Sequence, residues 1–570
     1  MPKPWQIRRI NFGILLLTSE PVHKNAINYP EPYLIEWSVL FRTPGLQLFS
    51  VTKLAMKWTF FLLVLALLST PLCAQHDGAR NAVQQIANGN FDQVEKTLAK
   101  TKKPFAGQAE NHFVRMLKLL AQDEIEQAYS EAKKSVAAGL PFERLLLGPK
   151  KELAKLQKLE AFQAWMNSQD IHQVVAGPML GNLTSSSVSI WIRTSTPTTI
   201  DVKLVNESQS FAKSSTIRTT DASDGTGVVT FQNLKPNTVY RYEIGQPQIT
   251  GQFTTRKAEG AASKFKVAFG GGAGFVPEWE RMWDTILKEN PQAMLMLGDN
   301  VYIDQPQFSL CQHYCYYRRQ CRPEWKRLIG QVPVYSIWDD HDFATNDCNI
   351  GPHIDKPAWK PIVWETFTQN WVNPAYGGGR QQPGCWYDFH IGDVHFIMLD
   401  GRYYRHRQGK TMLGPVQKKW ALKTLKESKA TFKVLVSPVP FTPGIKPGSK
   451  DPWDGFPEER EELFAAIEKN EIEGVFLVAA DRHRTDLRRI KRPDGYDLYE
   501  FMSSKLTNVH THPVVKTDGL VWGYNKTCSF GLMEFDTTVA NPQVNMKCIS
   551  IDGKVIHEHT LKHSLLKISR

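Results

Sequence analysis

The chain has 570 residues, of which 42% are hydrophobic and 22% charged, and its formal net charge at pH 7 is +12. A chain of this length exceeds one ordinary hydrophobic core, so we expect two or three globular domains. The lysines and arginines are spread along the chain, and the sequence has neither a zinc-finger cysteine pattern nor a P-loop, so the charge predicts no specific nucleic-acid binding.

Residues 56–74 have the features of a secretory signal peptide. Lys57 provides the positive charge, a short apolar stretch follows it, and Ala74 is the small residue that signal peptidase prefers. The apolar stretch is too short for a membrane span of about 20 residues, so we expect no transmembrane span in the mature protein. The prediction is an exported protein, which is secreted, periplasmic or held in the cell envelope.

Signal peptides stand at the N-terminus of a chain, whereas this segment lies inside the sequence. We therefore interpret Met56 as the true start and residues 1–55 as a mispredicted extension. The alternative is that 1–55 is a cytoplasmic extension and that residues 58–72 are a membrane anchor.

Residues 75–165 are predicted to be helical. One set of apolar and small residues at helical spacing repeats after 34 residues, as Phe91, Val94 and Leu98 and then as Ile125, Ala128 and Ala132. That period is typical of tetratricopeptide-type (TPR-like) helix pairs. Two copies are too few for a solenoid, so we predict a small helical module.

Residues 171–256 change to alternating apolar and polar positions over short stretches, for example at 188–192, with polar turns between them. This pattern predicts a β-sandwich. The run at 234–244 resembles the corner of fibronectin type III domains, in which a tyrosine hydroxyl is tied to the backbone. We therefore predict a fibronectin III-like domain that carries no chemistry of its own.

From residue 264 onward the pattern is that of an α/β fold. An amphipathic helix with Trp283 and Ile286 on one face follows the first predicted strand. Continuous apolar runs, as expected of strands buried on both faces, predict strands at 266–269, 293–297, 332–338, 394–399, 432–436 and 474–479. We expect a catalytic domain over residues 264–560.

Polar clusters follow four of these strands, at 298–302, 339–342, 400–403 and 481–483. Ligand groups in open α/β sheets gather beyond the carboxyl ends of the strands, so the four clusters predict one shared site. Converging buried carboxylates repel one another, and bound cations remove that repulsion. An oxygen-rich set suits Ca²⁺, Mn²⁺, Mg²⁺ or Fe³⁺, and two such ions can clamp a phosphate.

The clusters resemble, in order, the motifs of binuclear metallophosphatases. GDNVY at 298–302 is similar to their GDxxY block, DDHD at 339–342 to GNH[DE], and ADRH at 480–483 to GHxH. With LDGRYYR at 399–405 and a preceding fibronectin-like domain, the ordered set over residues 172–550 resembles the alkaline phosphatase D (PhoD-like) family. The resemblance implies a four-layer α/β (α+β) metallophosphatase domain that binds two metal ions.

The same resemblance implies roles for the matched residues as metal ligands. Asp299 would bridge the two metals, Tyr302 would be a phenolate ligand of an iron-type ion, and Asp340 would take the place of a metal-binding asparagine. Asp481 and His483 would complete the set.

The resemblance also implies which residues act on the phosphate. His341 would protonate the leaving oxygen or steady the phosphate. Asn300 and Arg402 would contact the phosphate or brace the metal ligands. Arginine suits bidentate phosphate recognition, although a salt bridge between Arg402 and Asp400 explains its position equally well.

The sequence departs from the family where the first strand ends. Residues 270–274 are Gly-Gly-Gly-Ala-Gly, whereas the family has a cysteine or an aspartate that binds iron there. Gly272 stands in place of that ligand, so a backbone carbonyl, a water or another side chain must replace it. The metals implied are Ca²⁺ and/or Fe³⁺, with Mn²⁺ as a further candidate, and the glycine argues against iron.

Three other features have a local interpretation. His510 and His512 are expected on a solvated loop, with contact to the site as the alternative. Cys528 and Cys548 flank two predicted antiparallel strands of an exported protein, so we pair them in a disulfide. The segment 446–460 is either a lid over the substrate pocket or a surface loop.

Taken together, these features predict a secreted, metal-dependent phosphoesterase of the alkaline phosphatase or phosphodiesterase type. It would hydrolyse phosphate mono- or diesters of small-molecule or lipid type by a metal-activated water. The alternative is a catalytically weakened cell-envelope protein that binds phosphate or a partner. The glycines at 270–274 favour this alternative, whereas the other ligand-type residues and His341 favour the enzyme.

Overall fold

The computed structural model describes residues 8–10, 14–16, 77–100, 107–206 and 212–568. The chain divides into two units, Met1–Pro71 and Leu72–Arg570. In the first unit, β1 (Arg8–Ile10) and β2 (Ile14–Leu16) pair as antiparallel strands. The predicted signal peptide at 56–74 lies outside the described residues. Within the described ranges, no helix combines the length and the apolar character that a membrane span requires.

The second unit begins with a helical segment at residues 78–167. Its helices are α2 (Gly78–Ala87), α3 (Phe91–Ala99), α4 (Gln108–Ala121), α5 (Ile125–Ala137), α6 (Arg144–Leu147), α7 (Lys150–Gln157) and α8 (Glu160–Asn167). The helices α2 and α3 pack as one pair, and α4 and α5 as another. The 34-residue repeat therefore marks the second helix of each pair, where Val94, Leu98, Ala128 and Ala132 are buried.

A β segment at residues 174–254 follows, in which two antiparallel sheets enclose one hydrophobic core. One sheet contains β3 (Val174–Gly181), β4 (Val188–Thr194) and β7 (Thr226–Phe231). The other contains β6 (Ala212–Arg218), β5 (Thr199–Asn206), β8 (Val239–Ile244) and β9 (Ile249–Thr254). The Tyr240 hydroxyl accepts a hydrogen bond from the backbone N–H of Lys235 at 2.9 Å, which is the tyrosine tie that the sequence predicts.

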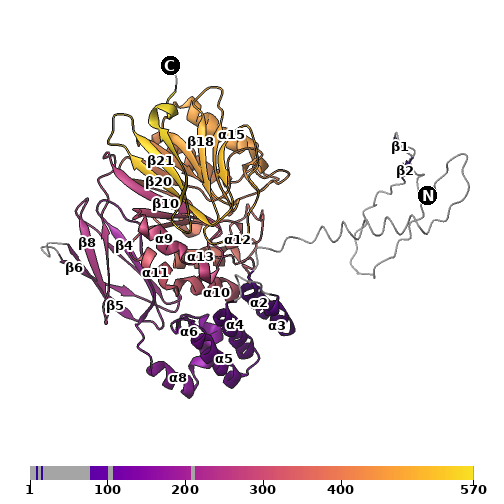
Figure 1. Ribbon diagram of the computed structural model, residues 1–570, viewed down its shortest axis with the longest axis vertical. Helices are drawn as coiled ribbons and strands as arrows, with labels where there is room; N and C mark the ends of the chain where they lie inside the picture. The colour runs from indigo at the N-terminus through magenta and orange to yellow at the C-terminus, as the bar shows by residue number, and fades with distance from the viewer. Residues whose placement is uncertain (1–7, 11–13, 17–76, 101–106, 207–211, 569–570) are drawn as a thin grey trace, which may run out of the picture. The chain divides into compact units, whose positions relative to one another are not determined.

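The α/β segment at residues 264–568 contains two mixed sheets (Figure 1). The six-stranded sheet has the order β12 (Val334–Ile337), β11 (Ala293–Leu297), β10 (Lys264–Gly270), β20 (Ser529–Asp536), β21 (Gln543–Ser550) and β22 (Val555–Lys562). The seven-stranded sheet has the order β13 (Tyr387–Ile391), β14 (Val394–Met398), β15 (Phe432–Val436), β16 (Val475–Ala479), β18 (Leu498–Ser503), β17 (Thr485–Ile490) and β19 (Leu520–Tyr524). All six strands predicted for this segment are present, within two residues at each end.

The two sheets face one another across an aromatic core. The ring centroids of Phe269 on β10 and Phe501 on β18 are 5.0 Å apart, and Phe535 on β20 contacts Phe396 on β14 at 5.9 Å. The strands β10, β11 and β12 are parallel, and so are β14, β15 and β16. Within each sheet, the carboxyl ends of these parallel strands therefore meet at one edge, as the predicted shared site requires.

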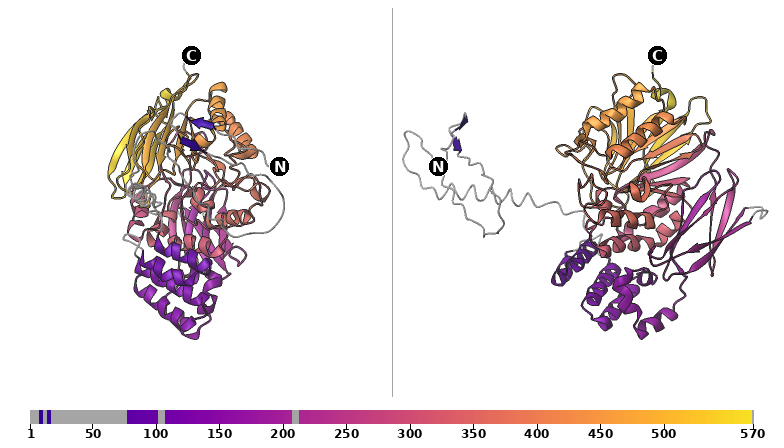
Figure 2. Two further views of the ribbon diagram at one scale, coloured as in Figure 1. Left: turned by 90° about the vertical axis from the view of Figure 1, so that its right-hand side faces the viewer. Right: turned by 180° about the vertical axis from the view of Figure 1, so that it is seen from behind.

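The helices of the α/β segment are α9 (Met282–Lys288), α10 (Ser309–Gln320), α11 (Pro323–Ile329), α12 (Asp340–Phe343), α13 (Lys360–Asn370), α14 (Gly414–Glu427) and α15 (Pro457–Lys469). The predicted helix after the first strand is α9, with Trp283 and Ile286 buried. Helix α14 contacts β14 of the seven-stranded sheet and α15 contacts α14 (Figure 2).

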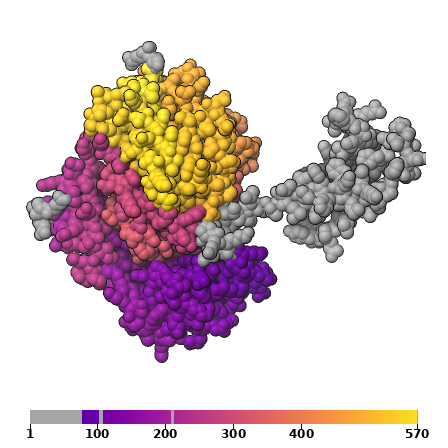
Figure 3. Space-filling model, viewed as in Figure 1, coloured from indigo at the N-terminus to yellow at the C-terminus, as the bar shows by residue number. Residues whose placement is uncertain are grey.

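The helical segment packs against the α/β segment, which Figure 3 shows as the indigo surface meeting the pink one. Asp77 caps α2 and accepts a hydrogen bond from Arg318 of α10 at 2.8 Å. Tyr314 of α10 donates to Glu110 of α4 at 2.7 Å. Both pairs are buried. These contacts place α2 next to the loop that follows β11, which carries predicted site residues.

The predicted disulfide between Cys528 and Cys548 is wrong. Both residues are buried free thiols, as are the other five cysteines of the described ranges. The register of β20 and β21 pairs Ser529 with Ser550 and Gly531 with Cys548. Cys528 is therefore offset along the ladder from Cys548, since flanking the same pair of strands does not make two residues neighbours across it.

Candidate metal centre

The predicted ligands from separate strands meet at the carboxyl edge of the sheets. Asp299 follows β11, Asp340 begins α12 after β12, and His341 comes next on α12. One ligand atom of each of these three buried residues lies within 4.8 Å of the others. Asp340 also accepts hydrogen bonds from the backbone N–H groups of His341 at 2.9 Å and Asp347 at 2.6 Å.

A second group of ligand-type atoms also meets at Asp299. The Tyr302 hydroxyl donates to Asp299 at 2.9 Å and lies 3.0 Å from Nε2 of His483, which follows β16. The same His483 nitrogen lies 3.4 Å from Asp299. Asp299 is thus shared between a group with Asp340 and a group with Tyr302 and His483, as expected of a bridging carboxylate.

Several buried polar atoms of the cluster have no hydrogen-bond partner among the described residues. They are Oδ1 of Asp299, Oδ2 of Asp339, Oδ2 of Asp481 and Nδ1 of His483. Buried polar atoms are nearly always partnered, so unpartnered carboxylate oxygens and an imidazole nitrogen at one place fit the ligand set of bound cations. Their chemistry, mostly oxygen with some imidazole, suits metal ions held by a phosphoesterase.

The electrostatics of two carboxyl groups in the cluster favour added positive charge. Burial raises the pKa of the Asp299 carboxyl well above its ordinary value, and the carboxylates of Asp340 and Asp339 add to the rise. Burial raises the pKa of Asp481, and Asp451 and Asp340 add to the rise although Lys446 and Arg482 oppose it. A cation would stabilise the charged form of each carboxylate and reverse this effect.

The backbone at the site adopts a conformation that L-residues rarely take. The φ angle is positive at Asp299 (52°), Tyr302 (57°), Asp304 (58°), Asp481 (68°) and His483 (46°). Such residues cost free energy and persist where the surrounding structure holds them, often at functional sites. Here the left-handed turns after β11 and β16 bring side chains from both strands to one point.

Asp304 holds the predicted acid catalyst, and sequence reasoning missed it. Its carboxylate contacts Nδ1 of His341, and Arg80 from α2 donates to the same carboxylate at 2.7 Å. Arg80 also donates to the backbone carbonyl of Tyr302 at 3.2 Å. Burial lowers the pKa of His341, but the carboxylates of Asp304, Asp299 and Asp340 outweigh burial, so its pKa lies well above the ordinary value. Asp304, which contacts the imidazole directly, is the largest of these charge effects.

Asn300 lies beneath the cluster rather than within it. Its side-chain amide donates to the carbonyl of Ile337 at 2.8 Å, at the end of β12. Its backbone N–H donates to Asp342 at 3.0 Å. These contacts join the loops after β11 and β12, which supports the bracing role and not direct phosphate contact.

Arg402 is fully buried among carboxylates. Its guanidinium donates to Asp339 through Nε and to Asp451 through a terminal nitrogen at 2.7 Å, and it lies 3.7 Å from Asp340. The alternative salt bridge to Asp400 is wrong, because the Asp400 carboxylate instead accepts from the Trp338 indole at 2.8 Å and from backbone N–H groups. Arg402 thus braces the residues around Asp340.

This bracing predicts a stability effect. Arg402→Met leaves buried carboxylates without their cation, so we expect a loss of about 3–5 kcal/mol in the free energy of unfolding, measured by urea denaturation. Arg327→Met is the matched control, because Arg327 forms a half-exposed ion pair with Asp284 and its loss costs within about 1 kcal/mol. Equal stability of the two variants would contradict the bracing role.

The glycine turn after β10 disfavours a side chain at Gly272. Gly272 has φ +64°, a conformation that L-residues rarely adopt, and a Cβ atom there would lie 3.0 Å from Cδ2 of His483. The first-strand ligand that the sequence lacks is therefore absent from a position where the backbone favours glycine. The expectation of a solvated loop for His510 and His512 is wrong, since both are half-buried beside His483.

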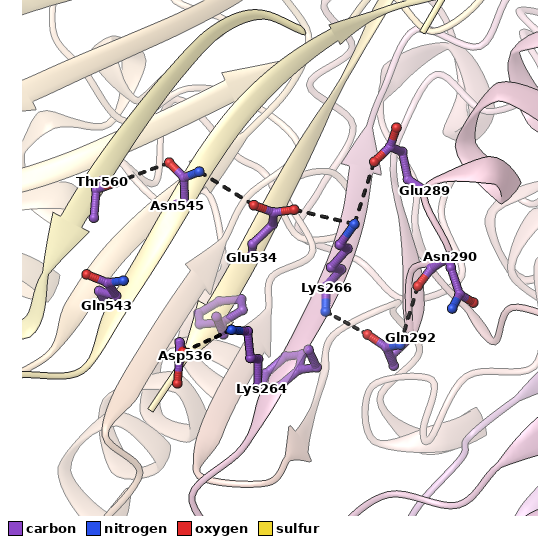
Figure 4. A pocket seen from close by; sticks show the side chains of 12 residues that line it. Lys264, Lys266, Glu289, Asn290, Gln292, Glu534, Asp536, Gln543, Asn545 and Thr560 are labelled. Atoms are coloured by element: carbon purple, nitrogen blue, oxygen red, sulfur yellow. Dashed lines mark hydrogen bonds and ion pairs between the residues drawn. The ribbon is translucent and has the colours of Figure 1, made fainter. Parts of the chain in front are cut away.

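Cavities elsewhere on the α/β segment lack comparable chemistry. A cavity of about 470 Å³ lies at the start of β10, at the end of the strand away from the cluster (Figure 4). Its charged groups are already paired, with Lys266 at 3.4 Å from Glu534 and Lys264 at 3.4 Å from Asp536. Figure 4 shows these side chains directed at one another, so they present no free charge to a ligand.

Two facing mixed sheets, with carboxylate, phenol and imidazole groups at their strand ends, define a metallophosphatase-like α/β protein. Residues 267–521 match the PhoD-like phosphatase family, and residues 171–259 match a domain of unknown function (DUF7800). The resemblance to the PhoD-like phosphatase family that the motifs predict is thus confirmed for residues 267–521. A match to this metallophosphatase family implies that the protein binds divalent metal ions.

Relatives and solved structures are similar at low identity. Alkaline phosphatase D of Bacillus subtilis (strain 168) is 23% identical over 44% of this chain and 52% of its own length, and purple acid phosphatase 23 of Arabidopsis thaliana is 23% identical over 30% and 39%. The chain thus spans about half or less of these relatives. A structure of PhoD superposes with a TM-score of 0.57 at 16% identity, over 69% of this chain and 90% of PhoD. The structure of purple acid phosphatase PPD1 of yellow lupin superposes with a TM-score of 0.52 at 13% identity, over 68% of this chain and 74% of PPD1.

Proposed function

We propose that this protein is an exported phosphoesterase that hydrolyses phosphate mono- or diesters of small-molecule or lipid type with two bound metal ions. The observation that carries the proposal is the position of Asp299, shared between a group with Asp340 and a group with Tyr302 and His483. Family membership supports the reaction class. Export rests on residues 56–74, and no specific nucleic-acid binding is proposed.

In this proposal Tyr302 and His483 would hold one ion, Asp340 and Asp481 would hold the other, and Asp299 would be a ligand of both. The ions would supply charge neutralisation of the phosphate and activation of water. The oxygen-only group suits Ca²⁺ or Mn²⁺. Iron at the other position would lack the ligand that Gly272 cannot provide.

His341 supplies the proton. Asp304 engages its Nδ1, which leaves Nε2 as the nitrogen that can donate to the departing oxygen. The carboxylate of Asp304 raises the pKa of His341 and so favours the imidazolium that donates the proton. Arg402 and Asn300 keep the loops that carry the ligands in place.

Metal removal is the direct test. We expect about two ions per chain by elemental analysis, and hydrolysis of a p-nitrophenyl monoester or diester that a chelator abolishes and added metal restores. The chelated protein should also unfold at lower denaturant, because ions at about 100 times their Kd stabilise by about 2.7 kcal/mol. Protein that holds metal but cleaves neither substrate would favour the alternative, a phosphate- or partner-binding envelope protein.

A further inference from the structure

Three imidazoles meet beside the glycine turn after β10. His510 and His512 lie on the segment between β18 and β19, and their ring centroids are 5.3 and 5.8 Å from that of His483. The Nε2 atoms of His510 and His512 are 3.2 Å apart. One ring nitrogen of each of the three residues lies within 4.8 Å of the others, a spacing that suits ligands around one cation.

The hydrogen bonds of the described residues account for only part of this arrangement, through the contact between Nε2 of His510 and Nε2 of His512. The His483 side chain is 2% exposed, and its Nε2 lies 3.0 Å from the Tyr302 hydroxyl and 3.4 Å from Asp299. An ion shared with Tyr302 would therefore take Nε2 of His483 and not Nδ1. The close approach of two further imidazoles to this buried histidine points to a ligand and not to a packing role.

The segment that carries the two histidines is fastened to the site. Asn508 donates to the Tyr302 hydroxyl at 2.5 Å and accepts from the backbone N–H of His510 at 2.9 Å. The Thr511 hydroxyl donates to the carbonyl of His483 at 3.0 Å. The imidazoles are therefore held in position before any ligand binds, as metal sites require.

We propose that His510 and His512 complete the coordination of the ion held by Tyr302 and His483, in place of a ligand from the glycine turn. This inference rests on the proposed two-metal function. Gly272 has no side chain to offer, and a Cβ there would lie only 3.0 Å from Cδ2 of His483, so the turn after β10 supplies no side-chain ligand at this position. A set with three imidazoles selects a borderline divalent ion such as Zn²⁺ at this position, in preference to Fe³⁺ or Ca²⁺.

The test measures metal binding without substrate. Metal-free wild type, H510A, H512A and the double variant are titrated with Zn²⁺, and with Co²⁺ as a visible-absorption probe of coordination. We expect the double variant to bind Zn²⁺ at least about 100-fold more weakly than wild type and to change the Co²⁺ spectrum, because loss of even an outer-shell partner costs about 10–100-fold. Ca²⁺ binding should be unchanged.

The matched control is H559A, which removes a half-buried histidine of β22 that belongs to no group of possible metal ligands among the described residues. H510Q and H512Q keep the size of the side chain and guard against misfolding, and circular dichroism checks the fold of each metal-free protein. Wild-type Zn²⁺ affinity and Co²⁺ spectrum in the double variants would overturn the inference. Because hydrolysis is not part of the readout, an inactive wild type would refute the phosphoesterase and leave the three-histidine site standing.

Discussion

We expect Asp299→Asn to lower phosphoesterase activity by at least about 10³-fold and to raise the free energy of unfolding of the metal-free protein. The loss of activity follows from the bridging position, because both groups of ligands share this carboxylate and transition-state charge stabilisation of this kind is worth about 10²–10³ or more in rate. The gain in stability follows from the buried Oδ1, which has no partner among the described residues. An amide at this position can donate to the neighbouring carboxylates. We therefore expect the free energy of unfolding to rise by about 1–3 kcal/mol.

The stability difference should depend on pH, and its sign is fixed. Burial raises the folded-state pKa of Asp299 above the value of about 3.9 in unfolded chains. Between these two pKa values the folded state binds more protons than the unfolded state, so the stability of metal-free wild type falls as pH rises. Asp299→Asn lacks this titration. The difference in free energy of unfolding between metal-free Asp299→Asn and metal-free wild type should therefore increase as pH rises above about 4.

Urea denaturation in the presence of a chelator, at several pH values, measures this difference. Asp284→Asn is the control, since Asp284 is a half-exposed partner of Arg327 on helix α9. It should leave activity and its pH dependence unchanged. A metal-free Asp299→Asn protein that is less stable than wild type at every pH would show that the carboxylate is structural, and retained activity would remove it from the bridging role.

Local patterns in the sequence predict the framework well because the responsible interactions are local. Strands such as β11 and β15 are buried on both faces, so continuous apolar runs mark them nearly to the residue. The repeat of Val94 and Ala128 marks equivalent helices because the helical period alone produces it. The convergence of Asp299 and Asp340 follows from the parallel order of their strands.

Contacts between distant segments could not be predicted in this way. His510 and His512 stand on an irregular segment without periodicity, and only the folded chain brings them to His483. Arg402 has three acidic neighbours, none of which is the nearby Asp400 that sequence proximity suggests. Side-chain partners across a fold depend on tertiary packing, which residue type and spacing do not encode.

Arg80 gives the second large prediction, because it connects the helical segment to the predicted acid. Arg80 on α2 donates to Asp304 at 2.7 Å, and Asp304 contacts Nδ1 of His341. We expect His341→Ala to lower kcat by about 10²–10⁴-fold, the range for a general acid. Asp304→Asn should lower kcat less than His341→Ala, because Asp304 acts only by contacting the imidazole. Arg80→Met should lower kcat least of the three, because Arg80 acts on the imidazole only through Asp304.

The three variants should share two properties that a general loss of structure would not produce. Their metal content should equal that of wild type, and KM should change little while kcat falls, because the orientation and protonation of His341 matter in the transition state. The basic limb of the kcat–pH profile should move to lower pH in Asp304→Asn, because the carboxylate of Asp304 is the largest charge effect that raises the pKa of His341.

Arg115→Met is the matched control on the helical segment, since Arg115 forms an exposed ion pair with Glu95 on the same segment. It should leave kcat unchanged. If Arg80→Met behaves like Arg115→Met, the helical segment has no part in positioning the acid. If Arg80→Met instead lowers kcat with intact metal content, α2 belongs to the active site, because Arg80 donates to Asp304, whose carboxylate contacts His341.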